Sequence, residues 1–301
     1  MEFEVRNPDG ALNGSVVFNW DPRDFQKLIE NCPAEPVTPY IHRYIPKQGI
    51  VLEAGCGSGR FVYYLAQEGY PIVGMEIGTE TVRTLNRMFP HLDIREGDVR
   101  ALPFGDDSLD GVISLGVIEH VIEGIDGPIR EMHRVLKPGC FGIVIVPSFN
   151  LIRRMKYRVG LLHVEAALLG LKKVNFVRRL FGKPPAPRAP RGKSPLKQYK
   201  RWPLLGDFFE YRFTKGEFER ELVNGGFEIV ESVPTSLMDG VYHEFGPRFV
   251  ALRDYTFYAN AAGRWLNDTL SKMPFVHNHM HLCVVRKPAK KSPPKLGQQQ
   301  T

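Results

Sequence analysis

The stretch from residue 50 to residue 61 constrains the fold more than any other part of the chain. Residues 50–54 have the apolar character of a buried strand and include the carboxylate of Glu53. Three alternating glycines come next (Gly55, Gly57, Gly59), and a helical apolar pattern begins directly after them. Glycine lets the backbone turn sharply and lets a ligand approach main-chain N–H groups. A strand, a glycine turn and a helix start together predict a nucleotide-type site at the carboxyl end of a parallel sheet.

Strand and helix patterns alternate along most of the chain. Strands are expected at residues 50–54, 71–76, 92–96, 109–115, 141–146, 227–233 and 279–286. Helices are expected at residues 60–68, from an N-cap at Thr79, at 128–136, and from an N-cap at Thr214 to residue 222. Such alternation is typical of an α/β protein with a doubly wound parallel sheet and right-handed crossovers.

The glycine spacing distinguishes between families of nucleotide-binding proteins. The dinucleotide fingerprint G-x-G-x-x-G would need glycine where Arg60 stands, and here the glycines fall as G-x-G-x-G with Glu53 two places before the first. This combination resembles motif I of the class I S-adenosylmethionine (SAM) methyltransferases. The resemblance covers residues 50–147 and, more weakly, 211–287. Ala101–Phe104 and Arg130–Gly139 resemble stretches common in the small-molecule branch of that family, with a mild departure at Cys140.

The resemblance implies a Rossmann-like sheet of seven strands with a reversed last strand and two late insertions. The expected division of the chain is 1–49 as an N-terminal lead-in or cap, 50–149 as the SAM-binding core, 150–210 as a basic insertion, 211–235 as a core helix and strand, 236–278 as a second insertion, 279–287 as the last strand and 288–301 as a disordered tail.

The resemblance also implies which residues bind SAM. Glu76, 19 residues after Gly57 and at a strand end, would accept from both ribose hydroxyls, and Ile77 would lie beside the adenine. Asp98 and Val99 would hold the adenine edge. The other expected cofactor residues are Glu53 at the amino end, Ser114 and Leu115 beneath the methionine part, and the turn residues Gly55, Cys56, Gly57 and Gly59. Taken singly, Glu53 or Glu76 would more often be a surface carboxylate at a strand end than a ligand, and Gly97-Asp98 is also an ordinary turn pair.

Glu119 and His120 follow the strand at 109–115 and are expected to begin a helix that faces the acceptor. A histidine there could act as general base for an acceptor hydroxyl. It is equally compatible with a structural role at a helix start, because methyl transfer can proceed through positioning alone.

No metal site is expected. Cys32, Cys56, Cys140 and Cys283 lie far apart without a CxxC pair, which argues against zinc or a disulfide framework and for a reducing compartment. His277, His279 and His281 alternate, so a strand would place them on one face, but no fourth ligand is evident and a solvated polar face is the simpler interpretation. Without a secretory signal or an apolar run of membrane-spanning length, a cytoplasmic location is expected.

Charge is distributed unevenly along the chain. Residues 151–205 carry fifteen Lys/Arg and one acid, a net of +14, which leaves −7 on the remainder of a chain whose total is +7. Apolar residues recur at helical spacing over 151–171, with Arg153, Arg154, Lys156 and Arg158 near the start. Such a segment suits a helix on an anionic membrane surface, a lid over the acceptor pocket, or, with less support because aromatic residues are sparse, a nucleic-acid contact.

Taken together, the sequence predicts a SAM-dependent methyltransferase that acts on a small-molecule or lipid-linked acceptor, with possible attachment to the cytoplasmic membrane face through residues 151–182. An RNA methyltransferase that uses the basic insertion as a clamp, and a SAM-binding module without turnover, are the alternatives.

Overall fold

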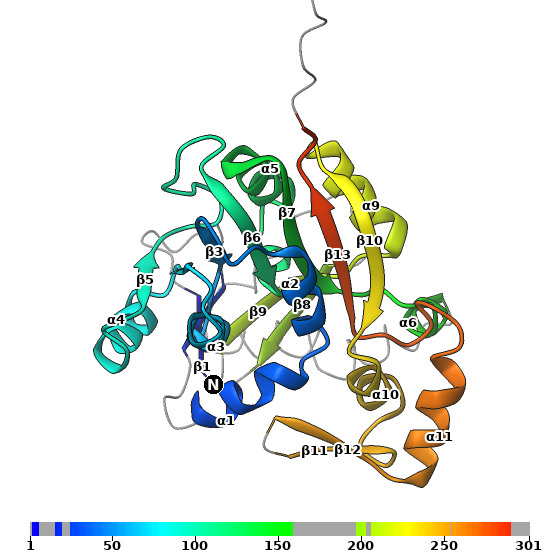
Figure 1. The fold of residues 1–301 in the computed structure, drawn as a ribbon. Helices are drawn as coiled ribbons and strands as arrows, with labels where there is room; N and C mark the ends of the chain where they lie inside the picture. Colours follow the sequence, from blue (N-terminus) through cyan, green and yellow to red (C-terminus); the bar gives the residue numbers. More distant parts are fainter. Residues whose placement is uncertain are drawn as a thin grey trace, which may run out of the picture.

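A computed structural model describes residues 2–5, 16–19, 25–158, 197–202, 206–253 and 255–289. Its centre is a seven-stranded sheet with the strand order β10-β13-β7-β6-β3-β4-β5 (Figure 1). The strands are β3 (Val51–Ala54), β4 (Ile72–Glu76), β5 (Asp93–Glu96), β6 (Leu109–Leu115), β7 (Leu136–Pro147), β10 (Glu228–Thr235) and β13 (Met280–Arg286). Only β13 runs antiparallel to its neighbours β7 and β10. The predicted doubly wound sheet with a reversed last strand is confirmed.

Two layers of helices cover the two faces of this sheet. One face packs against α1 (Phe25–Asn31), α2 (Thr38–Tyr44), α3 (Arg60–Gln67) and α4 (Thr79–Met88), and the other against α5 (Asp126–Val135) and α9 (Lys215–Asn224). Along β7, Ile143 and Ile145 enter the first core while Val144 and Val146 enter the second. Successive side chains of a strand point to opposite faces, so apolar runs of this kind occur where a strand is buried on both sides.

Helix starts follow the predicted chemistry in one case and depart from it in another. Thr214 caps α9 in a capping box with Glu217, as expected. The predicted cap at Thr79 is wrong, because the N-cap residue of α4 is Gly78 and Thr79 is the first helical residue. The Thr79 hydroxyl instead donates to Glu96 at the end of β5, over a distance of 2.9 Å.

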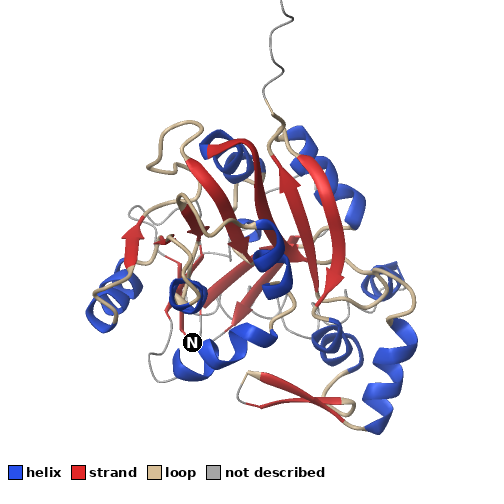
Figure 2. Cartoon of the chain, in the orientation of Figure 1, coloured by secondary structure: helices blue, strands red, loops and turns tan. Residues whose placement is uncertain are grey.

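Further elements lie outside the sheet (Figure 2). They are β1 (Glu2–Val5) paired with β2 (Val16–Asn19), the short helix η2 (Cys32–Ala34), α6 (Leu151–Arg158), β8 (Lys197–Trp202) paired with β9 (Gly206–Tyr211), and, between β10 and β13, α10 (Leu237–Phe245), β11 (Val250–Arg253), β12 (Thr256–Ala259) and α11 (Ala261–Leu270). The predicted helix at 151–171 is described only as far as residue 158, and most of the predicted tail, residues 290–301, lies outside the described residues. None of the helices in the described ranges is long and apolar enough to cross a membrane.

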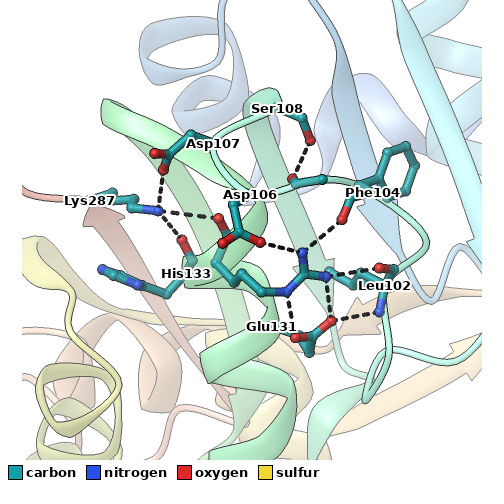
Figure 3. Close-up of polar contacts among 10 residues, drawn as sticks. Leu102, Phe104, Asp106, Asp107, Ser108, Glu131, His133 and Lys287 are labelled. Atoms are coloured by element: carbon teal, nitrogen blue, oxygen red, sulfur yellow. Dashed lines mark hydrogen bonds and ion pairs between the residues drawn. The ribbon is translucent and has the colours of Figure 1, made fainter.

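Arg134 of α5 joins two stretches already noted in the sequence, Ala101–Phe104 and Arg130–Gly139. Its guanidinium donates to the backbone oxygens of Leu102 and Phe104 at 2.9 and 2.8 Å, and it pairs with Glu131 at 2.7 Å (Figure 3). Glu131 in turn accepts from the backbone N–H of Leu102 at 2.8 Å. The segment that follows Asp98 is therefore fixed onto α5.

Candidate functional site

The glycine turn after β3 adopts backbone conformations that side chains disfavour. Gly55, Gly57 and Gly59 have φ angles of 80°, 52° and 71°. The N–H groups of Gly55 and Cys56 both donate to the Met75 oxygen at 2.8 Å, which binds the turn to β4. A Cβ on Gly55 would come within 2.3 Å of Val117, so the turn also packs closely against the segment after β6. Only glycine fits this backbone, which is the reason for the alternating pattern.

Glu76, at the end of β4, holds this turn in place. Its Oε2 accepts from the N–H of Gly57 at 2.9 Å, and its Oε1 accepts from the N–H of Gly78 at 3.0 Å. The side chain is buried, and this burial raises its pKa even though backbone hydrogen bonds from Gly78, Gly57 and Ile77 favour the charged form. A carboxylate has about four acceptor positions, so Glu76 retains capacity to accept from a ligand.

Glu53 is the second buried carboxylate of the site. Its Oε2 is buried and accepts no hydrogen bond among the described residues. Burial raises the pKa of Glu53 to about 8, against the opposing charge of Arg60. A cationic ligand group beside this oxygen would favour the ionised form of Glu53, so the carboxyl can become its counter-charge when such a ligand binds.

Asp98 follows β5 and is bound by Arg100. The Arg100 Nη2 and Nε lie 2.6 and 2.9 Å from Asp98 Oδ2. Burial opposes ionisation of Asp98, but the hydrogen bonds from Arg100 outweigh it, and the pKa of the carboxyl lies below its ordinary value. Asp98 is therefore a fixed negative charge at the edge of the site.

These groups surround a cavity of about 270 Å³ at the carboxyl ends of the strands. Its lining contains nine of the eleven residues predicted for the cofactor: Glu53, Gly55, Cys56, Gly57, Glu76, Ile77, Asp98, Val99 and Leu115. Gly59 and Ser114 are not part of the lining. Gly59 is the N-cap residue of α3, where a Cβ would approach Leu85 to 3.1 Å, and Ser114 is fully buried within β6.

Sequence reasoning missed several members of the lining: Ser58, Arg60, Phe61, Gly97, Gly116, Val117 and Val121. Ser58, Arg60 and Phe61 belong to the same turn and helix start as the predicted residues, so the spacing of the turn was an available signal. Val117 and Val121 reach the cavity because the chain after β6 runs along it, and the sequence has no comparable signal for that course.

Glu119 and His120 differ in their access to the cavity. They lie in a 3₁₀ turn, η3 (Ile118–His120), rather than at the start of an α-helix as expected. His120 lines the cavity, whereas Glu119 is buried beneath it and does not. The two side chains approach to 3.7 Å between Nε2 and Oε1, and burial raises the pKa of Glu119 well above its ordinary value. Of the two predicted catalytic candidates, only His120 can contact a ligand in this cavity.

The predicted common face of three histidines is wrong. β13 begins at Met280, so only His281 lies in a strand, and its Nε2 is 2.8 Å from the Ser232 hydroxyl. His277 and His281 are fully buried rather than solvated, and burial lowers the pKa of both. His279 approaches Asp239 instead.

The basic start of α6 also differs from expectation. Arg153 is buried, and its Nε lies 2.8 Å from Glu244 Oε1, while Lys156 Nζ lies 3.1 Å from Glu244 Oε2. These two charges therefore hold α6 against α10. The exposed side chains of α6 include Leu151 and Met155, which are 46% and 60% exposed. Comparison with known proteins gives this architecture its context.

A family model described as a methyltransferase domain matches residues 52–144. A protein of Mycolicibacterium smegmatis described as a probable S-adenosylmethionine-dependent methyltransferase is 36% identical over 98 residues, which are 33% of this chain and 38% of that protein. A demethylmenaquinone methyltransferase of Chlorobaculum parvum is 26% identical over 124 residues, which are 40% of this chain and 51% of that enzyme. The chain thus spans about half or less of the length of these relatives.

Among solved structures, a SAM-dependent methyltransferase of Methanosarcina mazei superposes with a TM-score of 0.54 and 20% identity. The alignment covers 84% of this chain and 98% of that one. At this level of identity the likeness concerns the fold, and it extends the agreement well beyond residues 52–144.

Proposed function

The chain carries a methyltransferase domain of the class I SAM-dependent family, and from this we propose that it transfers the methyl group of SAM to a small amphiphilic or lipid-linked acceptor. The observation that carries the proposal is the cavity at the carboxyl edge of the sheet, in which two buried carboxylates and a glycine turn meet. SAM supplies an electrophilic methyl group on a sulfonium sulfur. The chain supplies binding, orientation and exclusion of water.

The residues of the cavity fit the parts of SAM. Glu53 Oε2, buried and without a hydrogen-bond donor among the described residues, suits the ammonium end. Glu76 lines the cavity and retains acceptor capacity beyond its backbone hydrogen bonds, which suits the ribose hydroxyls. Asp98 and the following Val99 suit the adenine edge, because a fixed carboxylate can accept from an exocyclic amine.

His120 is the group placed to handle a proton. Its side chain lies in the cavity wall, and an imidazole there can take the proton that an acceptor hydroxyl releases as it is methylated. Glu119 contributes from below as a positioning residue. Burial raises the pKa of its carboxyl well above the ordinary value, and its Oε1 lies 3.7 Å from His120 Nε2.

The proposed acceptor class is based on exposed apolar side chains in α6 and in the second insertion, two segments that follow the carboxyl ends of β7 and β10. Leu151 and Met155 of α6 point outward at the beginning of the segment with a net charge of +14. In the second insertion Tyr258, Trp265 and Met273 are 56%, 68% and 53% exposed. Exposed aromatic and aliphatic side chains, in a chain whose residues 151–205 are rich in Lys and Arg, favour contact with an anionic membrane surface. The name of the C. parvum relative, a demethylmenaquinone methyltransferase, supports an acceptor of this kind.

Sedimentation with lipid vesicles tests the membrane part of the proposal. The full chain should pellet with anionic vesicles and not with neutral ones, and the binding should weaken as salt is raised. Changing both Leu151 and Met155 to Ser should reduce the bound fraction, while Met88→Ser, at another exposed methionine on α4, should leave it unchanged. Equal indifference to both vesicle types would refute docking, and salt-sensitive binding to an RNA pool alone would favour the RNA methyltransferase.

The acceptor itself is found by comparing lipid and metabolite extracts of cells with and without the protein. The proposal predicts a compound that becomes heavier by one CH₂ unit in the presence of the chain and that partitions into the lipid extract. A product confined to the RNA fraction would contradict it.

A further inference from the structure

Three metal-ligating side chains meet in the insertion between β10 and β13. Asp239 and His243 are four residues apart on α10, so they share one face of the helix. His279, from the segment before β13, completes the group. Asp239 Oδ1 lies 2.6 Å from His243 Nδ1, Asp239 Oδ2 lies 3.9 Å from His279 Nε2, and one ligand atom of each residue lies within 4.8 Å of the others.

We propose that Asp239, His243 and His279 bind a divalent transition-metal ion, with Zn²⁺ the ion that their chemistry favours. Imidazole nitrogen and carboxylate oxygen are both common zinc ligands, whereas Mg²⁺ and Ca²⁺ prefer oxygen alone. Three protein ligands leave at least one coordination position for water or for another ligand, as in zinc sites that are not purely structural.

The backbone around the three residues is held in place by the fold. Gly240 allows α10 to lie directly on the segment before β13, because a Cβ there would stand 1.7 Å from the backbone oxygen of His277. The N–H of His279 donates to the Ser236 oxygen at 3.3 Å, and its oxygen accepts from the N–H of Ser148 at 2.8 Å. The third ligand is therefore fixed from both sides relative to α10.

The two histidines lie side by side and are only partly covered. The rings of His243 and His279 stack with their centroids 4.1 Å apart and an interplanar angle of 27°. The side chain of His243 is 36% exposed and those of Asp239 and His279 are 18% and 13% exposed, which gives an ion a path from solvent into a mostly enclosed site.

The site lies at the same edge of the sheet as the cavity. β10 is antiparallel to β13, which is antiparallel to β7, so β10 runs in the same direction as β7, β6 and β3. α10 follows the carboxyl end of β10, just as the glycine turn follows the carboxyl end of β3. A bound ion would fasten the second insertion to the segment before β13 at this edge.

The test is a Zn²⁺ titration of the full chain by calorimetry after dialysis against a chelator. One ion per chain should bind, and Co²⁺ in its place should give the visible absorption of a low-symmetry, nitrogen- and oxygen-ligated ion. The variants Asp239→Asn, His243→Ala and His279→Ala should each weaken Zn²⁺ binding by about 100-fold or more. Removing a residue that only hydrogen-bonds to a metal ligand already costs about 10–100-fold in affinity, and these variants remove the ligands themselves.

Controls separate this site from chance binding and from misfolding. His42→Ala and His91→Ala, at exposed histidines elsewhere, should leave Zn²⁺ affinity unchanged. Zn²⁺ should raise the Tm of the wild-type chain and of these controls but not that of the three site variants, whose own melting transitions report that they fold. Absence of Zn²⁺ binding, or binding that survives all three site substitutions, would overturn the proposal and leave an ordinary Asp–His ion pair. SAM affinity is measured in parallel, and its loss alone would bear on the proposed function and not on the metal site.

Discussion

The backbone N–H of Gly57 donates a hydrogen bond of 2.9 Å to Oε2 of Glu76. Together with the bonds from the Gly55 and Cys56 N–H groups to the Met75 oxygen, it joins the turn after β3 to the carboxyl end of β4. Because Gly57 has a φ of 52° and Glu76 is buried, neither residue can be replaced without moving the other. The geometry of the cavity thus depends on a contact between two strands that are neighbours in the sheet and are separated in sequence by a helix.

Glu53 should make stability depend on pH in a direction opposite to that of an ordinary paired carboxylate. Its pKa is raised to about 8, whereas in the unfolded chain it ionises near the ordinary value of 4.5. Between these values the unfolded chain has released the proton and the folded chain retains it. The free energy of unfolding therefore loses up to about 1.4 kcal/mol per pH unit as pH rises from about 5 to 8.

Denaturant unfolding of the wild type and of Glu53→Gln at a series of pH values checks this. The stability of the Gln variant relative to the wild type should increase as pH rises through that window and then level off above about pH 8. A difference that does not change with pH would mean that Glu53 is ionised in the folded protein.

His120→Ala should lower kcat by about 10²–10⁴ while leaving SAM affinity nearly unchanged, if the imidazole takes a proton from the acceptor. Steady-state kinetics with the identified acceptor, together with SAM titration, measure the two effects separately. His91→Ala, at an exposed histidine, is the matched control. A loss below about tenfold at every pH would show that positioning alone suffices for transfer.

Arg153→Ala should destabilise the protein by about 1.5–3 kcal/mol, because the buried carboxylate of Glu244 loses its closest side-chain partner and keeps Lys156. Arg286→Ala removes an ion pair with Glu228 in which both side chains are nearly half exposed, and it should cost less than about 1 kcal/mol. Thermal and urea unfolding of both variants make the comparison. Similar losses for the two would contradict the structural role assigned to Arg153.

The sequence predicted the features of this fold that depend on short-range patterns. The apolar strands, the glycine turn and the carboxylates of Glu53 and Glu76 are encoded within a few residues of one another, and all were found where expected. The cap at Thr214 is equally local, since Glu217 completes it three residues later. Thr79 shows the limit, because its hydroxyl has a competing partner in Glu96, which belongs to another element.

Features that depend on tertiary packing were not predictable in this way. The apolar spacing of 151–171 indicated an amphipathic helix, but the burial of Arg153 follows from Glu244, 91 residues away. The approach of His279 to Asp239 follows from the fit of Gly240 against His277. Nothing in the spacing of the three histidines indicates which of them would meet α10.

Calorimetric titration of the chain with SAM tests the central claim most directly. The wild type should bind a single SAM molecule, and Gly57→Val should weaken binding by about 100-fold or more, because the branched side chain strains the turn and enters the cavity beside Glu76. Gly105→Val, at an exposed glycine with open space around its Cα, should bind SAM as the wild type does. Unchanged SAM affinity in Gly57→Val, or no SAM binding by the folded wild type, would contradict the assignment of this cavity as the cofactor site.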